Sequence, residues 1–218
     1  MLKTPKINII SNKSYTLPFS HRRNIARLAL NPQGNLLLSV DEDGRTILTN
    51  FPRRLALHHF SFKTPISALA FSPSGRHFAV GIGRLIEVWH TPSTPDAHTE
   101  DGLEFAPFVR HRVYTGHYDT VQSLEWSSDS RFFLSAAKDL TSRIWSLDPE
   151  DGFVATTLAG HREGVLGAWF SSNQEEVGCR DLVLTIGAAD RQPDIYSKPR
   201  WGIIPVELRA KTNYRWRS

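Results

Sequence analysis

The chain has 218 residues, of which 40% are hydrophobic and 22% are charged, and its formal net charge is +4. This composition excludes a wholly disordered or collagen-like chain, and no apolar run reaches the roughly 18 residues of a membrane-spanning helix. The single cysteine, Cys179, excludes an internal disulfide and a multi-cysteine zinc site, and residues 1–10 lack the apolar core of a secretion signal.

Four segments of the chain repeat one pattern. In each segment a stretch rich in apolar residues leads into a polar turn, and a second apolar stretch follows. Pro32-Gln33-Gly34 and Pro73-Ser74-Gly75 build the first two turns, where proline restricts the backbone and glycine permits unusual dihedral angles. Pro32 and Pro73 lie 41 residues apart, a period that indicates a repeated supersecondary unit. The four copies begin near residues 25, 66, 121 and 165.

Each copy is expected to form four short strands. The first two strands flank the polar turn, and a tight turn at Asp43-Gly44 or Asp139-Leu140 leads into the third strand. Four strands in about 40–45 residues are typical of one blade of a β-propeller. The sequence therefore predicts an all-β, partial propeller of about three and a half four-stranded blades. Outer strands are expected near 56–60, 108–114 and 153–158.

The predicted organisation has three parts. Residues 1–176 form the partial propeller, and residues 91–104 form an acidic, Pro/Thr-rich insert loop, because such a composition cannot build a core. Residues 177–218 lack the repeat pattern and are expected to form an irregular basic tail. This tail either contacts RNA or results from a shifted reading frame or altered splicing, and the abrupt loss of the pattern favours the second interpretation. The blades are placed near 21–60, 62–114, 117–158 and 161–176.

The copies resemble WD repeats at both ends. Gly116-His117 and Gly160-His161 resemble the dipeptide that opens such repeats, and Trp89 and Trp145 stand where WD repeats place Trp-Asp. The resemblance implies a hydrogen-bonded set of His, Ser/Thr, Asp and Trp within a blade. The third copy supplies His117, Ser135, Asp139 and Trp145, and the first supplies His21, Ser39 and Asp43, with Thr49 replacing Trp. The second copy keeps only Trp89, and the fourth departs after His161, because Val183 stands where Asp is expected.

We interpret this set as structural. A His, a Ser and an Asp also make a hydrolase triad, but catalytic triads do not recur with the period of a fold. A buried carboxylate that accepts hydrogen bonds from His and from backbone N–H groups rigidifies a thin sheet. Zinc is not expected, because His58-His59 and the pair His111 and His117 lack a suitably spaced carboxylate or thiolate. We therefore predict no enzyme activity, catalytic residue, metal site or cofactor.

Segments outside the general WD pattern resemble a family of nucleolar WD-repeat scaffolds of the small-subunit processome. The resemblance covers roughly residues 11–175 and implies a non-catalytic role in pre-rRNA processing and in assembly of small nucleolar ribonucleoprotein on nascent pre-rRNA, in the nucleus and nucleolus. The implied partners are other WD-repeat proteins of the processome and small nucleolar RNA or pre-rRNA, contacted directly or indirectly. No membrane and no small-molecule substrate are implied. The segments are 15–17, 21–26, 30–45, 50–54, 58–63, 105–108, 114–117 and 158–162.

Three small basic clusters are candidate contacts with RNA or with an acidic partner protein, although a solvated sheet edge is the simpler interpretation of each. They consist of Arg22 and Arg23, Arg53 and Arg54, and Arg110 and Arg112.

Other functions remain open at this point. The chain could be a WD-repeat adaptor of a ubiquitin ligase or vesicle assembly, or a truncated product without a separate role. A propeller hydrolase would require carboxylates or histidines gathered in a central channel, and the sequence does not show them.

Overall fold

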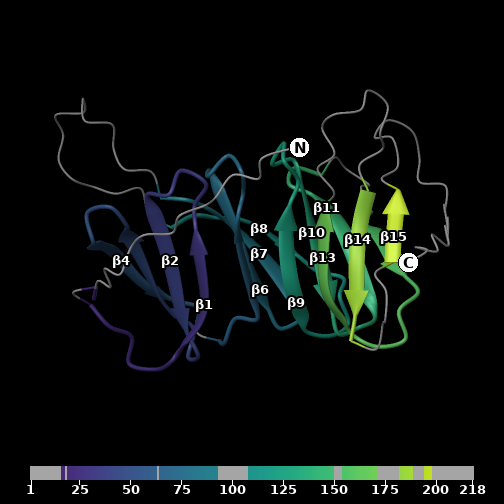
Figure 1. Ribbon diagram of the computed structural model, residues 1–218, viewed down its shortest axis with the longest axis horizontal. Helices are drawn as coiled ribbons and strands as arrows, with labels where there is room; N and C mark the ends of the chain where they lie inside the picture. The colour runs from purple at the N-terminus through teal and green to yellow at the C-terminus, as the bar shows by residue number, and fades with distance from the viewer. Residues whose placement is uncertain are drawn as a thin grey trace, which may run out of the picture.

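The computed structural model describes residues 16–17, 19–62, 64–92, 108–149, 154–170, 182–188 and 194–197. Within these ranges all regular structure is β-strand, and none of it is a helix long and apolar enough to span a membrane. Four antiparallel sheets stand side by side in chain order, from the purple sheet at the left to the yellow strands at the right (Figure 1). Residues 93–104 of the predicted insert and most of the predicted tail lie outside the described residues.

The first two sheets each contain four strands, and every strand pairs with the next one along the chain. The first sheet consists of β1 (Ile25–Leu30), β2 (Leu36–Asp41), β3 (Arg45–Asn50) and β4 (Leu55–Ser61). The second consists of β5 (Ala68–Phe71), β6 (His77–Ile82), β7 (Leu85–His90) and β8 (Arg110–Tyr114).

The third sheet repeats this meander, and the fourth contains three described strands. The third consists of β9 (Val121–Trp126), β10 (Phe132–Ala137), β11 (Thr141–Ser146) and β12 (Thr156–Ala159). The fourth consists of β13 (Val165–Phe170), β14 (Leu182–Gly187) and β15 (Asp194–Ser197).

The fourth sheet corrects the predicted end of the repeats. We placed the end of the fourth blade near residue 176, and the tail was expected to begin at 177. Instead β14 pairs antiparallel with β13, and β15 pairs with β14. The sequence pattern failed here because an additional segment, residues 171–181, separates the first two strands of this sheet. The blade spacing that holds in the other copies is therefore lost, although the strand itself is present.

The turn after the first strand has the same construction in three sheets. The backbone N–H of Gly34 donates to the carbonyl of Asn31 at 2.9 Å, and Gly75 donates to Ser72 at 2.8 Å. Both glycines have a φ of 71°, the left-handed region that glycine adopts without strain. The third copy places Ser130 there with a φ of 59°, and its N–H donates to Ser127 at 2.9 Å. The repeated Pro and Gly positions thus mark real turns.

The hydrophobic core lies between neighbouring sheets. One cluster joins the first and second sheets through residues such as Leu38 and Phe78, and another joins the second and third through Ile86 and Phe133. A third cluster packs Leu134 of β10 against Val165 of β13. Each sheet buries apolar side chains against the next sheet along the chain, as expected when a single blade cannot enclose a core alone. The polar network described next braces such a thin sheet from within.

Candidate functional site

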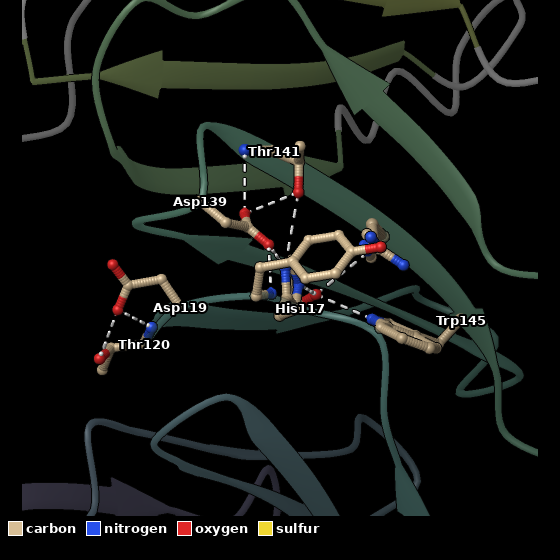
Figure 2. Close-up of polar contacts among 9 residues, drawn as sticks. His117, Asp119, Thr120, Asp139, Thr141 and Trp145 are labelled. Carbon is tan, nitrogen blue, oxygen red and sulfur yellow. Dashed lines mark hydrogen bonds and ion pairs between the residues drawn. The ribbon is translucent and has the colours of Figure 1, made fainter.

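A hydrogen-bonded chain of side chains crosses the third sheet. His117 precedes β9, Ser135 lies on β10, Asp139 lies in the turn between β10 and β11, and Trp145 lies on β11. His117 Nδ1 is 2.8 Å from Asp139 Oδ2, and His117 Nε2 is 2.6 Å from Ser135 Oγ (Figure 2). The indole N–H of Trp145 donates to Ser135 Oγ at 2.8 Å. With a neutral imidazole, Nδ1–H donates to the carboxylate and Nε2 accepts from the Ser135 hydroxyl, so every donor has an acceptor.

The Asp139 carboxylate also holds the turn that carries it. Oδ2 accepts the backbone N–H of Tyr118 at 2.9 Å. Oδ1 accepts the N–H of Thr141 at 3.1 Å and the Thr141 hydroxyl at 2.7 Å (Figure 2). Leu140, next to the aspartate, has a φ of 69°. This left-handed conformation is unfavourable for any residue other than glycine. These contacts join the loop before β9 to the turn between β10 and β11.

Burial and hydrogen bonding set the ionisation of the two central groups. Burial lowers the pKa of His117, and the hydrogen bond and negative charge of Asp139 oppose this shift without cancelling it. Burial by itself would raise the pKa of Asp139. The hydrogen bonds from Tyr118, Thr141 and His117 outweigh that effect, and the pKa lies below its usual value. A neutral imidazole beside an ionised carboxylate is therefore the favoured state near neutral pH.

This arrangement joins strands and has no access for a substrate. The Ser135 hydroxyl is fully buried, and His117 is only 3% exposed. A serine nucleophile needs a path to the scissile group and a nearby oxyanion site. Here Ser135 Oγ contacts His117, Trp145 and the carbonyl of Arg143 instead. The geometry fits the structural role that the sequence indicated for these residues.

The first sheet repeats part of the network and corrects one prediction. His21 Nε2 lies 2.8 Å from Ser39 Oγ, as in the third sheet. Its Nδ1, however, lies 3.5 Å from Asp41 Oδ2, whereas Asp43 was expected there. Asp41 is fully buried at the end of β2, and its Oδ1 accepts the N–H groups of Asp43 and Arg45. The Asp43 side chain points outward and is 51% exposed. Equal spacing in the sequence did not reveal which of two nearby carboxylates turns inward.

The fourth sheet contains a partner that the sequence did not reveal. His161 Nε2 lies 2.7 Å from Thr185 Oγ1, and Thr185 is fully buried. Thr185 pairs with Ala168 on β13, as Ser135 pairs with Leu124 on β9, so it occupies the Ser/Thr position of the set. The residues from His to Ser/Thr span 18 positions in the third copy and 24 in the fourth. The alignment that placed Val183 at the Asp position of the set was therefore wrong, because it assumed a constant spacing from His161.

The three predicted basic clusters lie on three separate surfaces. Arg22 and Arg23 precede β1, at the end of the first sheet where the turn between β2 and β3 also lies. Arg53 and Arg54 lie between β3 and β4, which places them at the opposite end of the same sheet. Neighbouring strands run antiparallel, so β1 and β3 run in the same direction, and a cluster before β1 and a cluster after β3 lie at opposite ends of the sheet. The last cluster, Arg110 and Arg112, lies on β8, the outer strand of the second sheet.

The side chains of these clusters differ in their contacts. Arg23 Nε lies 3.5 Å from Asp43 Oδ2, and Arg110 forms an ion pair with Glu87 at 3.2 Å. Both arginines remain more than half exposed. Arg22 lines an open hollow of about 500 Å³ together with Arg45, a residue the sequence analysis did not single out. Two arginines thus line one concave surface at this end of the first sheet.

The fold and its repeated network define the class of the protein. Residues 53–90 and 108–146 match the family described as "WD domain, G-beta repeat". The structure is similar to that of U3-55K, with a TM-score of 0.64 at 22% identity over 83% of this chain and 51% of that one. It is likewise similar to the RRP9 WD40 repeats, with a TM-score of 0.62 at 22% identity over 81% of this chain and 49% of that one. The protein is a WD-repeat β-propeller protein, which confirms the predicted fold class.

Curated relatives refine this assignment. The chain is 67% identical over 170 residues to "Periodic tryptophan protein 2 homolog" of Neurospora crassa. It is 52% identical over 171 residues to "Periodic tryptophan protein 2" of Saccharomyces cerevisiae. These matches cover 78% of this chain but only 19% and 18% of the two relatives, so the chain spans about a fifth of their length. Over the matched residues the chain belongs to the periodic tryptophan protein 2 family, which confirms the predicted resemblance.

Proposed function

We propose that the protein is a non-catalytic WD-repeat scaffold of small-subunit ribosome biogenesis, acting in the nucleolus in pre-rRNA processing and in assembly of small nucleolar ribonucleoprotein on nascent pre-rRNA. The observation that carries the proposal is the 67% identity over 170 residues to a periodic tryptophan protein 2 homolog. The match covers 78% of this chain.

The geometry of the sheets is consistent with a scaffold. The polar residues at the centre of the third sheet are used in holding strands and turns together, which leaves the sheet edges as contact surfaces. We infer that the partners are other WD-repeat proteins of the small-subunit processome, with small nucleolar RNA or pre-rRNA bound directly or through those proteins.

The hollow beside Arg22 and Arg45 is the surface we assign to direct RNA contact. Two arginines line it, and a guanidinium group can bind a phosphate through paired N–H donors. Arg53 and Arg54 at the opposite edge provide a matched pair of exposed arginines outside this hollow.

Affinity purification of the tagged chain from nuclear extract tests the proposal, with partners identified by mass spectrometry and RNA by sequencing. We expect processome WD-repeat proteins and small nucleolar RNA. Ubiquitin-ligase or vesicle-coat proteins without such RNA would identify an adaptor of another complex, and the absence of any stable partner would support a product without a separate role.

Ultraviolet crosslinking separates direct from indirect RNA contact. A double variant of Arg22→Ala and Arg45→Ala should lose crosslinked RNA at least tenfold and keep its protein partners. The control, Arg53→Ala with Arg54→Ala, should retain the RNA signal. Equal crosslinking in both variants would place the RNA contact on the partner proteins.

A further inference from the structure

Three histidines meet at one edge of the second sheet. His77 is the first residue of β6, His90 is the last residue of β7, and His111 lies near the start of β8. Strand pairing sets His77 directly opposite His90. The N–H of His90 donates to the carbonyl of Val109 at 2.8 Å, which brings the start of β8 to the same edge. Three neighbouring strands therefore deliver one imidazole each to the same place.

The three rings are close enough to share one ion. Their ring centroids are 4.7, 5.2 and 5.1 Å apart, and one nitrogen of each ring lies within 4.8 Å of the others. Bonds of about 2.0–2.1 Å in a tetrahedral zinc site place two ligand nitrogens about 3.3 Å apart. His111 Nδ1 and His90 Nε2 are already 3.3 Å apart. The third ligand nitrogen, on His77, must move by only about 1–1.5 Å to reach the same separation from the other two, and rotation of its side chain supplies this movement.

The surroundings of His111 leave its Nδ1 free of a proton. Asp148 Oδ1 lies 3.0 Å from His111 Nε2, and the carbonyl of Leu147 lies 3.3 Å from the same atom. Nε2–H therefore donates outward, and the lone pair of Nδ1 faces His90. A histidine that binds a metal ordinarily donates its second N–H to a carboxylate or carbonyl in this way.

We propose that His77, His90 and His111 form a site for a divalent transition metal of the Zn²⁺ class, with Asp148 as the residue that positions His111. Imidazole ligands suit zinc, copper and nickel, whereas magnesium and calcium prefer oxygen ligands. The rings remain partly accessible to solvent, which leaves the fourth coordination position to water. The ion would cross-link β6, β7 and β8, so its binding stabilises the folded sheet by mass action.

The proposed site departs from the expectation that the chain binds no metal. That expectation came from short spacings along the sequence. His77, His90 and His111 are separated by 13 and 21 residues, and only the pairing of the strands brings them together. The alternative for the same geometry is a metal-free pair in which one ring of His90 and His111 donates a hydrogen bond to the other.

Titration of the purified, chelator-treated full chain with Co²⁺ and then Zn²⁺ tests the site. We expect one equivalent of Co²⁺ with the visible absorption of tetrahedral cobalt, displacement by Zn²⁺, and a higher unfolding temperature with metal. His90→Gln and His111→Gln should each lower the affinity at least tenfold, and Asp148→Asn should lower it about 10–100-fold. His59→Gln, which changes an exposed histidine on β4, is the matched control and should bind like the wild type.

Absence of saturable Co²⁺ binding, or equal affinity in wild type, His90→Gln and His111→Gln, would overturn the proposal. Circular dichroism in chelator checks that each variant is folded. A second measurement needs no variant: imidazole nitrogen resonances of the wild-type chain are followed as Zn²⁺ is added. The site predicts that three histidine spin systems shift together at one equivalent, and a shift of none of them, or of His59 alone, would refute it.

Discussion

Replacement of Asp139 by alanine is the most informative change in the hydrogen-bonded network. The carboxylate accepts four hydrogen bonds, from the ring of His117, the N–H of Tyr118, and the N–H and hydroxyl of Thr141. A hydrogen bond to a charged group contributes roughly 1.5–3 kcal/mol, but the four are not additive. Water can replace the acceptor for Tyr118, which is exposed. The buried N–H of His117 has no such replacement.

We therefore expect Asp139→Ala to lower the free energy of unfolding by about 3–4 kcal/mol, near the cost of breaking a buried pair. That is a large fraction of the roughly 5–15 kcal/mol typical of a folded domain. Asp43→Ala is the matched control at the same position of the first sheet. Asp43 is half exposed and its carboxylate lies 3.5 Å from Arg23, so its loss should cost at most about 1 kcal/mol. Asp41→Ala should resemble Asp139→Ala, because Asp41 is the buried carboxylate of that sheet.

Urea unfolding followed by circular dichroism measures these differences. With a slope of roughly 2 kcal/mol per molar urea, the Asp139→Ala midpoint should fall by about 1.5–2 M at an unchanged slope. The reasoning is refuted if Asp139→Ala and Asp43→Ala destabilise the chain equally, or if Asp43→Ala costs more than Asp41→Ala.

Three further changes test the same region. Trp145→Phe removes the N–H donated to Ser135 and should cost about 1–3 kcal/mol in urea unfolding; an unchanged midpoint would contradict the hydrogen bond. Burial lowers the pKa of His117, so as the pH falls below about 6.5 the unfolded chain binds a proton before the folded chain does, and stability falls. The urea midpoint should fall between pH 7 and pH 5 in the wild type and fall less in His117→Gln. An equal fall in both would exclude His117 as the cause. Burial raises the pKa of Glu125, which means that its ionised form destabilises the folded chain at pH 7. Glu125→Gln should therefore raise the free energy of unfolding at pH 7 by less than about 1 kcal/mol, seen as a higher unfolding temperature, and this gain should vanish near pH 4. A lower unfolding temperature at pH 7 would contradict the assignment.

The strands and turns were predictable because their chemistry is local. Gly34 and Gly75 occupy turns that need a positive φ, and the apolar residues around them alternate with the pleat of a strand. The set of His117, Ser135, Asp139 and Trp145 was also predictable, because the resemblance to WD repeats implied it and this copy keeps all four residue types.

The remaining features depend on contacts between distant residues or on the direction of one side chain. Asp41 and Asp43 lie two residues apart, and only the folded turn decides which carboxylate faces His21. Thr185 escaped notice because the segment before β14 lengthens the usual spacing. The cluster of His77, His90 and His111 exists only where three paired strands end at the same edge, which no short sequence motif records.

Conditional depletion of the gene product, with ribosomal RNA precursors followed by hybridisation, tests the proposed role in ribosome biogenesis most directly. A scaffold of small-subunit assembly predicts that precursors of the small-subunit RNA accumulate and the mature small-subunit RNA declines, while the large-subunit RNA is made normally. Normal processing of both RNAs after depletion, or an equal loss of both, would contradict the account.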